Sequence, residues 1–240
     1  SSPGGCRHDT IPCMTPIPIL ALIPAFNEAR RIVPVIRAAQ AHLPVLVVDD
    51  GSSDETAQTA EAAGAVVLRQ VPNQGKGAAL RAGFHHALAQ GCQAVLTLDA
   101  DGQHDPAEIP AFLAAHRATG ADLIIGARDF TRMPFTRRLA NTLGQGIFSW
   151  SLGQPIRDNQ SGYRLISRRL VEAVLESQEQ GFEFEVEMIV TCTRRQFRME
   201  WVPIQTIYRD QGSHIRPIQH MINFFRLSWK TYQSRKTNQT

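Results

Sequence analysis

The stretch VLVVDDGSSD at residues 45–54 decides the fold of this 240-residue chain. Residues 45–48 have the length and apolar composition of a buried strand, and an acidic turn rich in Ser and Gly follows at residues 49–54. The Ala-rich segment at residues 55–63 is typical of a helix, and Ser53 or Asp54 is suited to cap it. The stretch therefore predicts a strand, a polar loop and a helix in that order.

The same unit recurs on both sides of this stretch. Apolar runs of strand length occur at residues 17–23, 66–69, 94–98 and 123–126, and helical spacing occurs at residues 28–41 and 78–90. Residues 128–160 are basic, contain glycine and show less regular spacing. Strands that alternate with helices predict an α/β fold, in which helices cover both faces of a mostly parallel sheet.

Polar segments follow four of the predicted strands. They are IPAFNE at residues 23–28, VDDGSSD at residues 48–54, NQGKG at residues 73–77 and DADGQH at residues 99–104. In parallel α/β sheets, ligands bind beyond the carboxyl ends of the strands. We therefore expect one crevice to collect these four segments.

The DADGQH segment places two carboxylates, Asp99 and Asp101, within reach of one hard cation, and Gln103 can add a carbonyl oxygen. Mg²⁺ and Mn²⁺ take oxygen ligands from carboxylates, phosphates and water. Such a cation neutralises the charge that develops on a departing diphosphate. A lone Asp-x-Asp sequence is more often a solvated acidic turn, but four ordered segments at strand ends favour the metal site.

The cysteine content and the lengths of the apolar runs indicate the cellular compartment and exclude some classes of protein. Four cysteines, Cys6, Cys13, Cys92 and Cys192, form no CxxC pair, which argues against a structural zinc site or a disulfide scaffold and fits a reducing cytoplasm. No run approaches the roughly 18 to 20 consecutive apolar residues of a membrane-spanning helix, and the first residues lack the apolar core of a signal peptide. We expect any membrane contact to be peripheral, at the cytoplasmic face.

The chain divides into three parts. Residues 1–16 are rich in Ser, Gly and Pro and predict a disordered leader or an expression remnant, and residues 17–216 form the α/β domain. Residues 217–240 predict a basic amphipathic helix. Two interpretations of that helix stay open: it packs on its own domain, or it lies at the membrane interface with its cations on anionic headgroups.

The order of the four polar segments resembles that of family 2 glycosyltransferases. The IPAFNE opening, the DDGS turn and the DADxQH segment are most similar to the dolichol and polyprenyl phosphate sugar synthases, and the resemblance covers residues 17–215. It implies a GT-A fold, with a Rossmann-like, mostly parallel sheet. It also implies inverting transfer of a sugar from a GDP- or UDP-linked donor, with Mg²⁺ or Mn²⁺ as cofactor, to an acceptor such as a lipid-linked phosphate.

The resemblance also implies roles for individual residues. It places the nucleoside at the IPAFNE and DDGS segments, although Phe26 could instead be an ordinary core aromatic. The metal ligands that it implies are Asp99, Asp101 and Gln103. The donor-binding residues are Pro24, Phe26, Glu28, Val48, Asp50, Lys76, Asp99, Ala100, Arg209 and His214. His214 stands where these synthases often carry Lys, and Lys76 lies in a glycine loop whose spacing differs from that of a Walker A motif.

The catalytic residues that the resemblance implies are Asp101, Arg128 and Asp158. Arg128 would face a donor or acceptor phosphate, because a guanidinium donates two parallel hydrogen bonds to it, but a plain surface Arg is the alternative. Asp158 would be the general base for a hydroxyl acceptor. A phosphate acceptor, with a second pKa of about 6, is already an anion, and Asp158 would then orient Arg164.

Some interpretations remain open. Residues 182–188 alternate acidic and apolar side chains, which predicts a strand or the start of a helix, and Glu185 or Glu187 could contribute to the acceptor side of the crevice or simply form a solvated face. A sugar nucleotidyltransferase is an alternative, but the glycine-rich signature that it would carry near the first strand is missing. A nucleotide-binding or nucleic-acid-binding module is another, although no nucleic-acid motif occurs. We therefore expect no nucleic acid as a partner.

Overall fold

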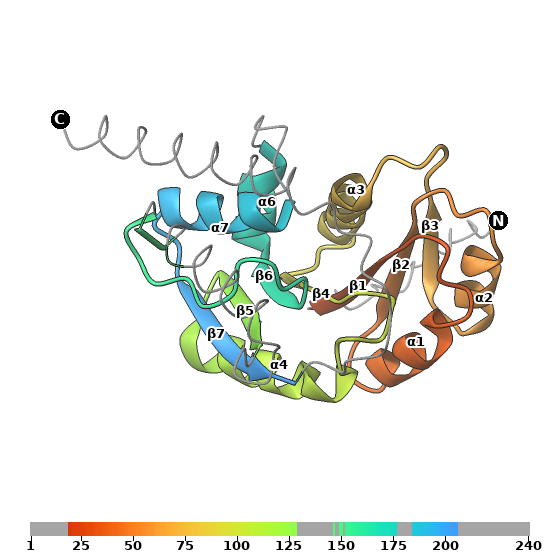
Figure 1. Cartoon of the computed structure of the whole chain (residues 1–240), viewed down its shortest axis with the longest axis horizontal. Coiled ribbons are helices and arrows are strands. Elements are labelled where there is room, and N and C mark those ends of the chain that lie inside the picture. Colours follow the sequence, from red (N-terminus) through yellow and green to blue (C-terminus); the bar gives the residue numbers. More distant parts are fainter. Residues whose placement is uncertain (1–18, 129–145, 147–148, 151, 177–183, 206–240) are drawn as a thin grey trace, which may run out of the picture.

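A computed structural model of the chain describes residues 19–128, 146, 149–150, 152–176 and 184–205 (Figure 1). Its centre is one seven-stranded sheet with the strand order β3-β2-β1-β4-β6-β5-β7. The strands are β1 Ile19–Ala25, β2 Val45–Asp49, β3 Val66–Arg69, β4 Ala94–Thr97, β5 Leu123–Arg128, β6 Arg164–Ser167 and β7 Met199–Ile204.

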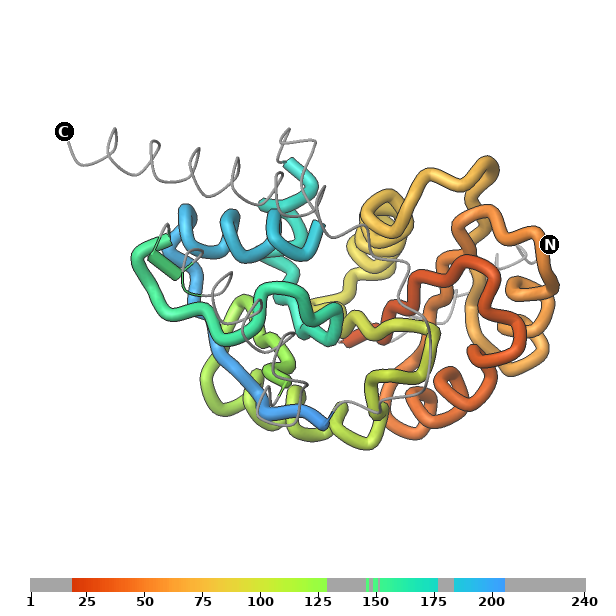
Figure 2. The backbone as a smooth tube through the Cα atoms, viewed as in Figure 1, coloured from red at the N-terminus to blue at the C-terminus, as the bar shows by residue number. Residues whose placement is uncertain are grey.

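Helices cover both faces of this sheet (Figures 1 and 2). One core cluster packs side chains of α3, α6 and α7 on the sheet, and a second packs side chains of α1, α2 and α4 on the other face. The helices are α1 Ile32–Gln40, α2 Thr56–Ala62, α3 Lys76–Ala89, α4 Ile109–Thr119, α6 Arg168–Glu176 and α7 Phe184–Arg194, with a short 3₁₀ helix η1 at Pro106–Glu108.

The sheet is mostly parallel, as predicted. β1 pairs in parallel with β2 and β4, β2 with β3, and β5 with β7. β6 is the exception, because it lies antiparallel between β4 and β5. This strand was not predicted, since it has four residues and begins with an Arg, and therefore gives no apolar run of strand length.

The predicted elements of the first half are confirmed with small shifts at their ends. The helix expected at residues 28–41 covers Ile32–Gln40, and the helix expected from residue 78 begins at Lys76. The prediction that Ser53 or Asp54 caps the next helix is wrong by one or two positions, because the N-cap of α2 is Glu55; Asp54 still accepts a hydrogen bond from the backbone amide of Thr56 at 3.0 Å. The alternating run at residues 182–188 is part of a helix where the structure describes it, because α7 begins at Phe184.

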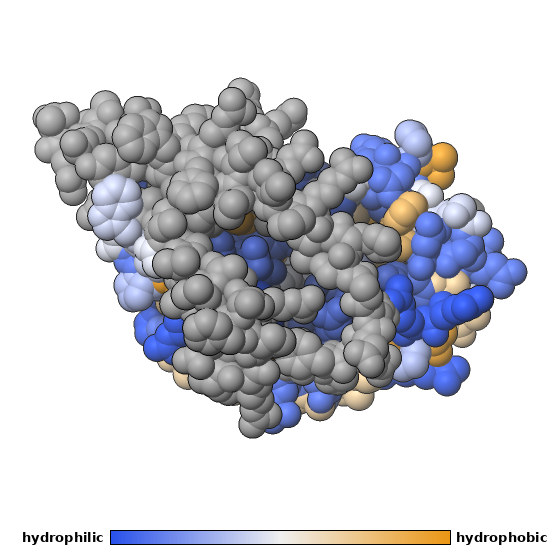
Figure 3. All heavy atoms as spheres, in the orientation of Figure 1, coloured by the Kyte–Doolittle hydropathy of each residue, from blue (hydrophilic) through white to orange (hydrophobic). Residues whose placement is uncertain are grey.

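The surface is polar where described residues are visible. On the face shown in Figure 3 most of them are hydrophilic, with a few apolar side chains between them. Among the described residues, no helix is long and apolar enough to cross a bilayer. The tail helix predicted at residues 217–240 lies outside the described residues.

We predict that Gly83→Ala destabilises the fold. α3 packs so closely on β1 that a Cβ at Gly83 would lie 2.3 Å from Cδ1 of the buried Leu22. Overpacking of a core costs about 1–3 kcal/mol, which exceeds the roughly 1 kcal/mol that Ala gains over Gly in a helix. The measurement is the free energy of unfolding in urea.

A Leu22→Ala background is the control for this prediction. There the added methyl group fills vacated space, so Gly83→Ala should raise the free energy of unfolding of that variant. Equal destabilisation in both backgrounds would show that the close approach to Leu22 is not the cause.

Candidate active site

The loops after β1 and β2 are joined to each other at the carboxyl edge of the sheet. Ala25 lies beside Asp49 in the register of the two strands, so both loops start at the same level. The Asn27 amide donates to Oγ of Ser52 at 2.9 Å, and Oδ1 of Asn27 accepts from the Ser53 amide at 2.9 Å. Asn27 has a φ of 56°, and these hydrogen bonds stabilise that left-handed conformation.

Asp50 anchors the glycine loop that precedes α3. Its Oδ1 accepts from the Gln74 amide at 2.9 Å and its Oδ2 accepts from the Gly75 amide at 2.7 Å. The Asp50 side chain is buried. The contact with the base or ribose that the sequence suggested for Asp50 remains a prediction, whereas its structural role in holding the NQGKG loop is clear from these hydrogen bonds.

Lys76 brings this loop to the DADGQH segment. Its Nζ lies 2.6 Å from Oδ1 of Asp99 and 2.8 Å from Oε1 of Glu185. Burial lowers the pKa of Lys76, but the two carboxylates outweigh that effect and raise it overall. Burial raises the pKa of Asp99, yet Lys76 and other nearby positive charge lower it to about 2. Ammonium and carboxylate are therefore both charged at neutral pH.

His104, the last residue of the DADGQH segment, holds the first residue of that segment by a hydrogen bond, a role that the sequence analysis missed. The Asp99 amide donates to Nδ1 of His104 at 3.2 Å, and the imidazole stacks on Tyr163 with ring centroids 5.0 Å apart. Burial lowers the pKa of His104 against the opposing effect of Asp99, so the ring is neutral near pH 7. Its position at the end of DADGQH was the signal that could have identified it.

Asp101 and Glu28 come together from different loops. Oδ1 of Asp101 accepts from the Gln103 amide at 2.9 Å, which fixes one end of the carboxylate. Burial raises the pKa of Glu28, Arg31 lowers it, and the negative charge of Asp101 raises it further. The two carboxylates therefore lie close enough to interact electrostatically, and the single crevice that would collect the first and fourth polar segments stays a prediction.

The residues of this crevice suit a divalent cation. Asp99 and Asp101 supply hard carboxylate oxygens, which Mg²⁺ and Mn²⁺ prefer. No group of three His, Cys, Asp or Glu side chains forms a closed metal cage among the residues that the structure describes. The amide contact of Gln103 is observed, and its carbonyl as a metal ligand stays a prediction.

Arg128 and Asp158 form a bidentate ion pair. Nε and Nη2 of Arg128 lie 2.7 and 2.9 Å from the two carboxylate oxygens of Asp158. The Gln160 and Ser161 amides also donate to this carboxylate, each at 3.1 Å, and the Asp158 side chain is only 1% exposed. Arg128 is therefore not a plain surface Arg, and its charge also lowers the pKa of Asp99.

Arg164 is held by backbone carbonyls. It donates to the carbonyl oxygens of Ser161 at 2.7 Å and of Asn159 at 3.0 Å, and also to that of Glu185. Asp158 pairs with Arg128, and its negative charge also acts on Arg164, so the predicted role of Asp158 in orienting Arg164 stays a prediction. Arg164 ties the loop before β6 to the start of α7.

The remaining predicted donor residues fall into four groups. Val48 is fully buried in the core and paired on both sides within the sheet, so the prediction that it binds a donor is wrong for its side chain. Phe26 is 48% exposed at the crevice loop, which excludes the ordinary core aromatic. Pro24 and Ala100 are buried beside the crevice loops, and Arg209 and His214 lie outside the described residues.

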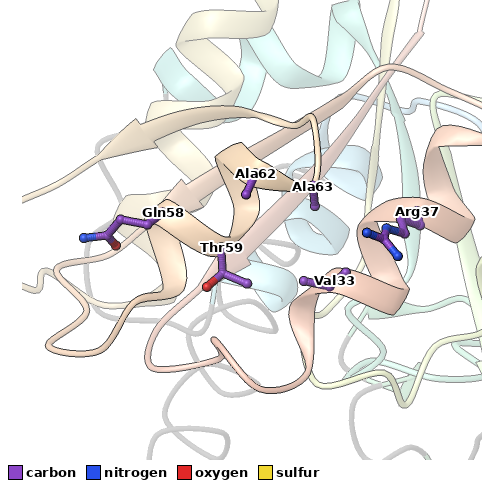
Figure 4. A pocket seen from close by; sticks show the side chains of 6 residues that line it. All are labelled: Val33, Arg37, Gln58, Thr59, Ala62 and Ala63. Atoms are coloured by element: carbon purple, nitrogen blue, oxygen red, sulfur yellow. The ribbon is translucent and has the colours of Figure 1, made fainter.

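A shallow hollow lies elsewhere, between α1 and α2 (Figure 4). It is lined by Val33, Arg37, Gln58, Thr59, Ala62 and Ala63. No carboxylate and no predicted site residue is among these side chains. We assign the candidate active site to the carboxyl edge of the sheet because contacts connect the four polar segments there. Hydrogen bonds join the first segment to the second and the second to the third, and the Lys76–Asp99 ion pair joins the third to the fourth.

Comparison with solved structures identifies the fold. Glucosyl-3-phosphoglycerate synthase from Mycobacterium tuberculosis, in a complex with Mn²⁺, UDP-glucose and phosphoglyceric acid, matches with a TM-score of 0.67. The match covers 91% of this chain and 79% of that chain at 23% sequence identity. The sheet with helices on both faces is therefore a GT-A fold.

The sequence relationship gives the family. The family model described as Glycosyl transferase family 2 matches residues 21–200, and the chain belongs to that family. It is a glycosyltransferase, which sets aside the nucleotidyltransferase and the non-catalytic binding module.

Two named relatives are similar over most of both chains. Undecaprenyl-phosphate mannosyltransferase from Micrococcus luteus is 32% identical, over 81% of this chain and 85% of that protein. Polyprenol monophosphomannose synthase from Mycolicibacterium smegmatis is 31% identical, over 80% of this chain and 78% of that protein.

We predict that Asp158→Asn destabilises the fold, because it removes the charge of a buried carboxylate that pairs with Arg128 through both of its oxygens. Breaking a buried ion pair from one side costs about 3 kcal/mol. Urea unfolding measures this loss, and Arg128→Lys should cost less, because it keeps the charge and loses only the bidentate geometry. An Asp158→Asn protein with unchanged stability and donor binding, but with transfer reduced about a thousandfold, would instead establish Asp158 as the general base.

Proposed function

We propose that this glycosyltransferase moves a sugar, with inversion, from a nucleotide diphosphate sugar to a polyprenyl phosphate, with the help of Mg²⁺ or Mn²⁺. The observation that carries this proposal is the meeting of Asp99, Asp101 and Lys76 at one edge of a GT-A sheet. The similarity to an undecaprenyl-phosphate mannosyltransferase and a polyprenol monophosphomannose synthase supports the acceptor.

The donor diphosphate needs positive charge around it. A divalent cation at Asp99 and Asp101 would neutralise the charge on the departing diphosphate. Lys76 places an ammonium beside Asp99, and it can donate to phosphate oxygens from there. Phe26 offers an exposed ring, and Glu28 a half-buried carboxylate, for the nucleoside at the other end of the donor.

A phosphate acceptor agrees with the chemistry of Arg128 and Asp158. An acceptor hydroxyl would need a base to remove its proton, whereas a phosphate near neutral pH is already an anion. Asp158 is buried and bound to Arg128 and two amides, so its lone pairs are engaged in structure. In this proposal Asp158 positions Arg128, and Arg128 and its neighbours orient the acceptor oxygen opposite the leaving group.

We predict that Asp101→Ala abolishes sugar transfer without loss of the fold. Wild-type protein should gain thermal stability from GDP or UDP only in the presence of Mn²⁺ or Mg²⁺, because a tightly bound ligand stabilises the native state. At a ligand concentration of about 100 Kd the gain is roughly 2.7 kcal/mol, and Asp101→Ala should lose it. A panel of nucleoside diphosphates measured by thermal unfolding gives the donor base at the same time.

Glu61→Ala is the matched control, since Glu61 is an exposed acid whose only role shown by the described contacts is an ion pair with Arg69. It should keep both the metal-dependent gain and the transfer. Normal transfer by Asp101→Ala would contradict the metal-dependent mechanism.

The lipid acceptor suggests a peripheral position at the cytoplasmic membrane face. The proposal rests on the sequence of residues 217–240, where apolar residues recur at helical spacing and Arg226 and Lys230 flank them. Each cation near an anionic surface contributes about 1 kcal/mol to binding.

We predict that replacing Arg226 and Lys230 together by Gln weakens binding to anionic vesicles roughly 30-fold, measured by sedimentation. Equal binding by both proteins, or equal binding to neutral vesicles, would remove the electrostatic membrane contact.

A further inference from the structure

Two ion pairs join α3 to α7. Lys76 and Arg81 lie on α3, and Glu185 and Glu187 lie on α7. Lys76 pairs with Glu185 at 2.8 Å, and Nη2 of Arg81 lies 2.9 and 2.8 Å from the two oxygens of Glu187. The same two helices therefore meet through one pair inside the crevice and one pair behind it.

The Arg81–Glu187 pair behind the crevice is buried and packs against neighbouring helices. Glu187 is 5% exposed, and Arg81 also donates to the Val174 carbonyl of α6 and stacks on the Phe184 ring at 4.7 Å. Phe184 in turn lies against Gly77: a Cβ added at Gly77 would be 3.4 Å from the Cβ of Phe184. These contacts fix the first turn of α7 against the first turns of α3, and so they fix the backbone at Glu185.

The pair inside the crevice has a different environment. Lys76 is 44% exposed at its side chain, and its ammonium contacts Asp99 as well as Glu185. The backbone at Gly162 closes one side, since a Cβ there would lie 3.0 Å from both Nζ of Lys76 and Oδ2 of Asp99. A Lys side chain is flexible, so its position depends on these two carboxylates and the glycine beside them.

We propose that Glu185 is a positioning residue, which holds the Lys76 ammonium beside Asp99 so that a fixed positive charge meets the phosphate groups of the donor. This inference rests on the proposed function. If Asp99 turns toward a cation and a diphosphate, Lys76 keeps Glu185 as a partner and stays in the crevice. Without Glu185, Asp99 is the one of these two carboxylates that still pairs with the ammonium. The Lys76 side chain can then turn toward solvent when Asp99 changes partner.

The test is a double-mutant cycle on donor affinity. Glu185→Gln, Lys76→Met and the double variant are compared with wild type by calorimetric titration with GDP and UDP in the presence of Mn²⁺. Gln keeps the size of the side chain and removes its charge. Hydrogen bonds between charged groups contribute about 1.5–3 kcal/mol, so we expect Glu185→Gln to weaken binding by roughly tenfold and Lys76→Met by at least as much.

The decisive result is the loss of the Glu185 effect once Lys76 is absent. We expect the double variant to bind the diphosphate no more weakly than Lys76→Met, because Glu185 acts through Lys76. A Glu185→Gln change that costs the same affinity in both backgrounds would overturn the inference. Glu185→Asp, which keeps the charge on a shorter side chain, should restore part of the affinity.

Two further variants separate positioning from folding. Glu172→Gln removes an exposed acid of α6 that pairs with Arg168, and it should leave affinity unchanged. Glu187→Gln should lower the unfolding temperature more than Glu185→Gln does, because Glu187 is the buried member. If wild type binds neither diphosphate with Mn²⁺ or Mg²⁺, the proposed function fails together with the inference. If wild type binds and the cycle is additive, only the inference fails.

Discussion

The ammonium of Lys76 between two carboxylates is the interaction on which the active site depends. Asp99 belongs to the loop after β4, Glu185 to α7 and Lys76 to the first turn of α3, so three elements distant in the sequence meet at one charge. Three acidic side chains, Asp99, Asp101 and Glu185, near one another would repel both each other and an incoming phosphate. A cation supplied by the protein lowers that repulsion before any ligand arrives.

The first half of the fold could be predicted because each of its elements carries a local signal. Buried parallel strands give continuous apolar runs, and polar segments follow them at the sheet edge where ligands bind. Residues 45–54 contain such a strand and segment within ten positions, and the structure has β2 and its loop there. The crevice could be predicted for the same reason, since Glu28, Lys76, Asp99 and Asp101 each follow a strand.

The second half lacked such signals because its residues are defined by tertiary contacts. Arg128 and Asp158 are 30 positions apart, and nothing in the spacing indicates that they pair rather than bind substrate. Arg164 begins a buried strand, where its guanidinium is satisfied by carbonyls that only the folded chain brings together. The side chain of Val48 was wrongly predicted as a donor ligand for the opposite reason: Val48 stands in a motif, but its strand is buried on both faces, so the side chain packs in the core.

The antiparallel strand β6 has a consequence for the order of folding during synthesis. β1 to β4 are adjacent in the sheet and consecutive in the chain, so this part can assemble as soon as it has left the ribosome. β5 emerges next, but its place in the sheet lies beyond β6, which is made almost forty residues later. The apolar β5 therefore stays unpaired until β6 has been made. Contacts between residues far apart in sequence also form slowly. A nascent chain paused in this interval exposes an unpaired apolar strand, which is the kind of segment that chaperones protect.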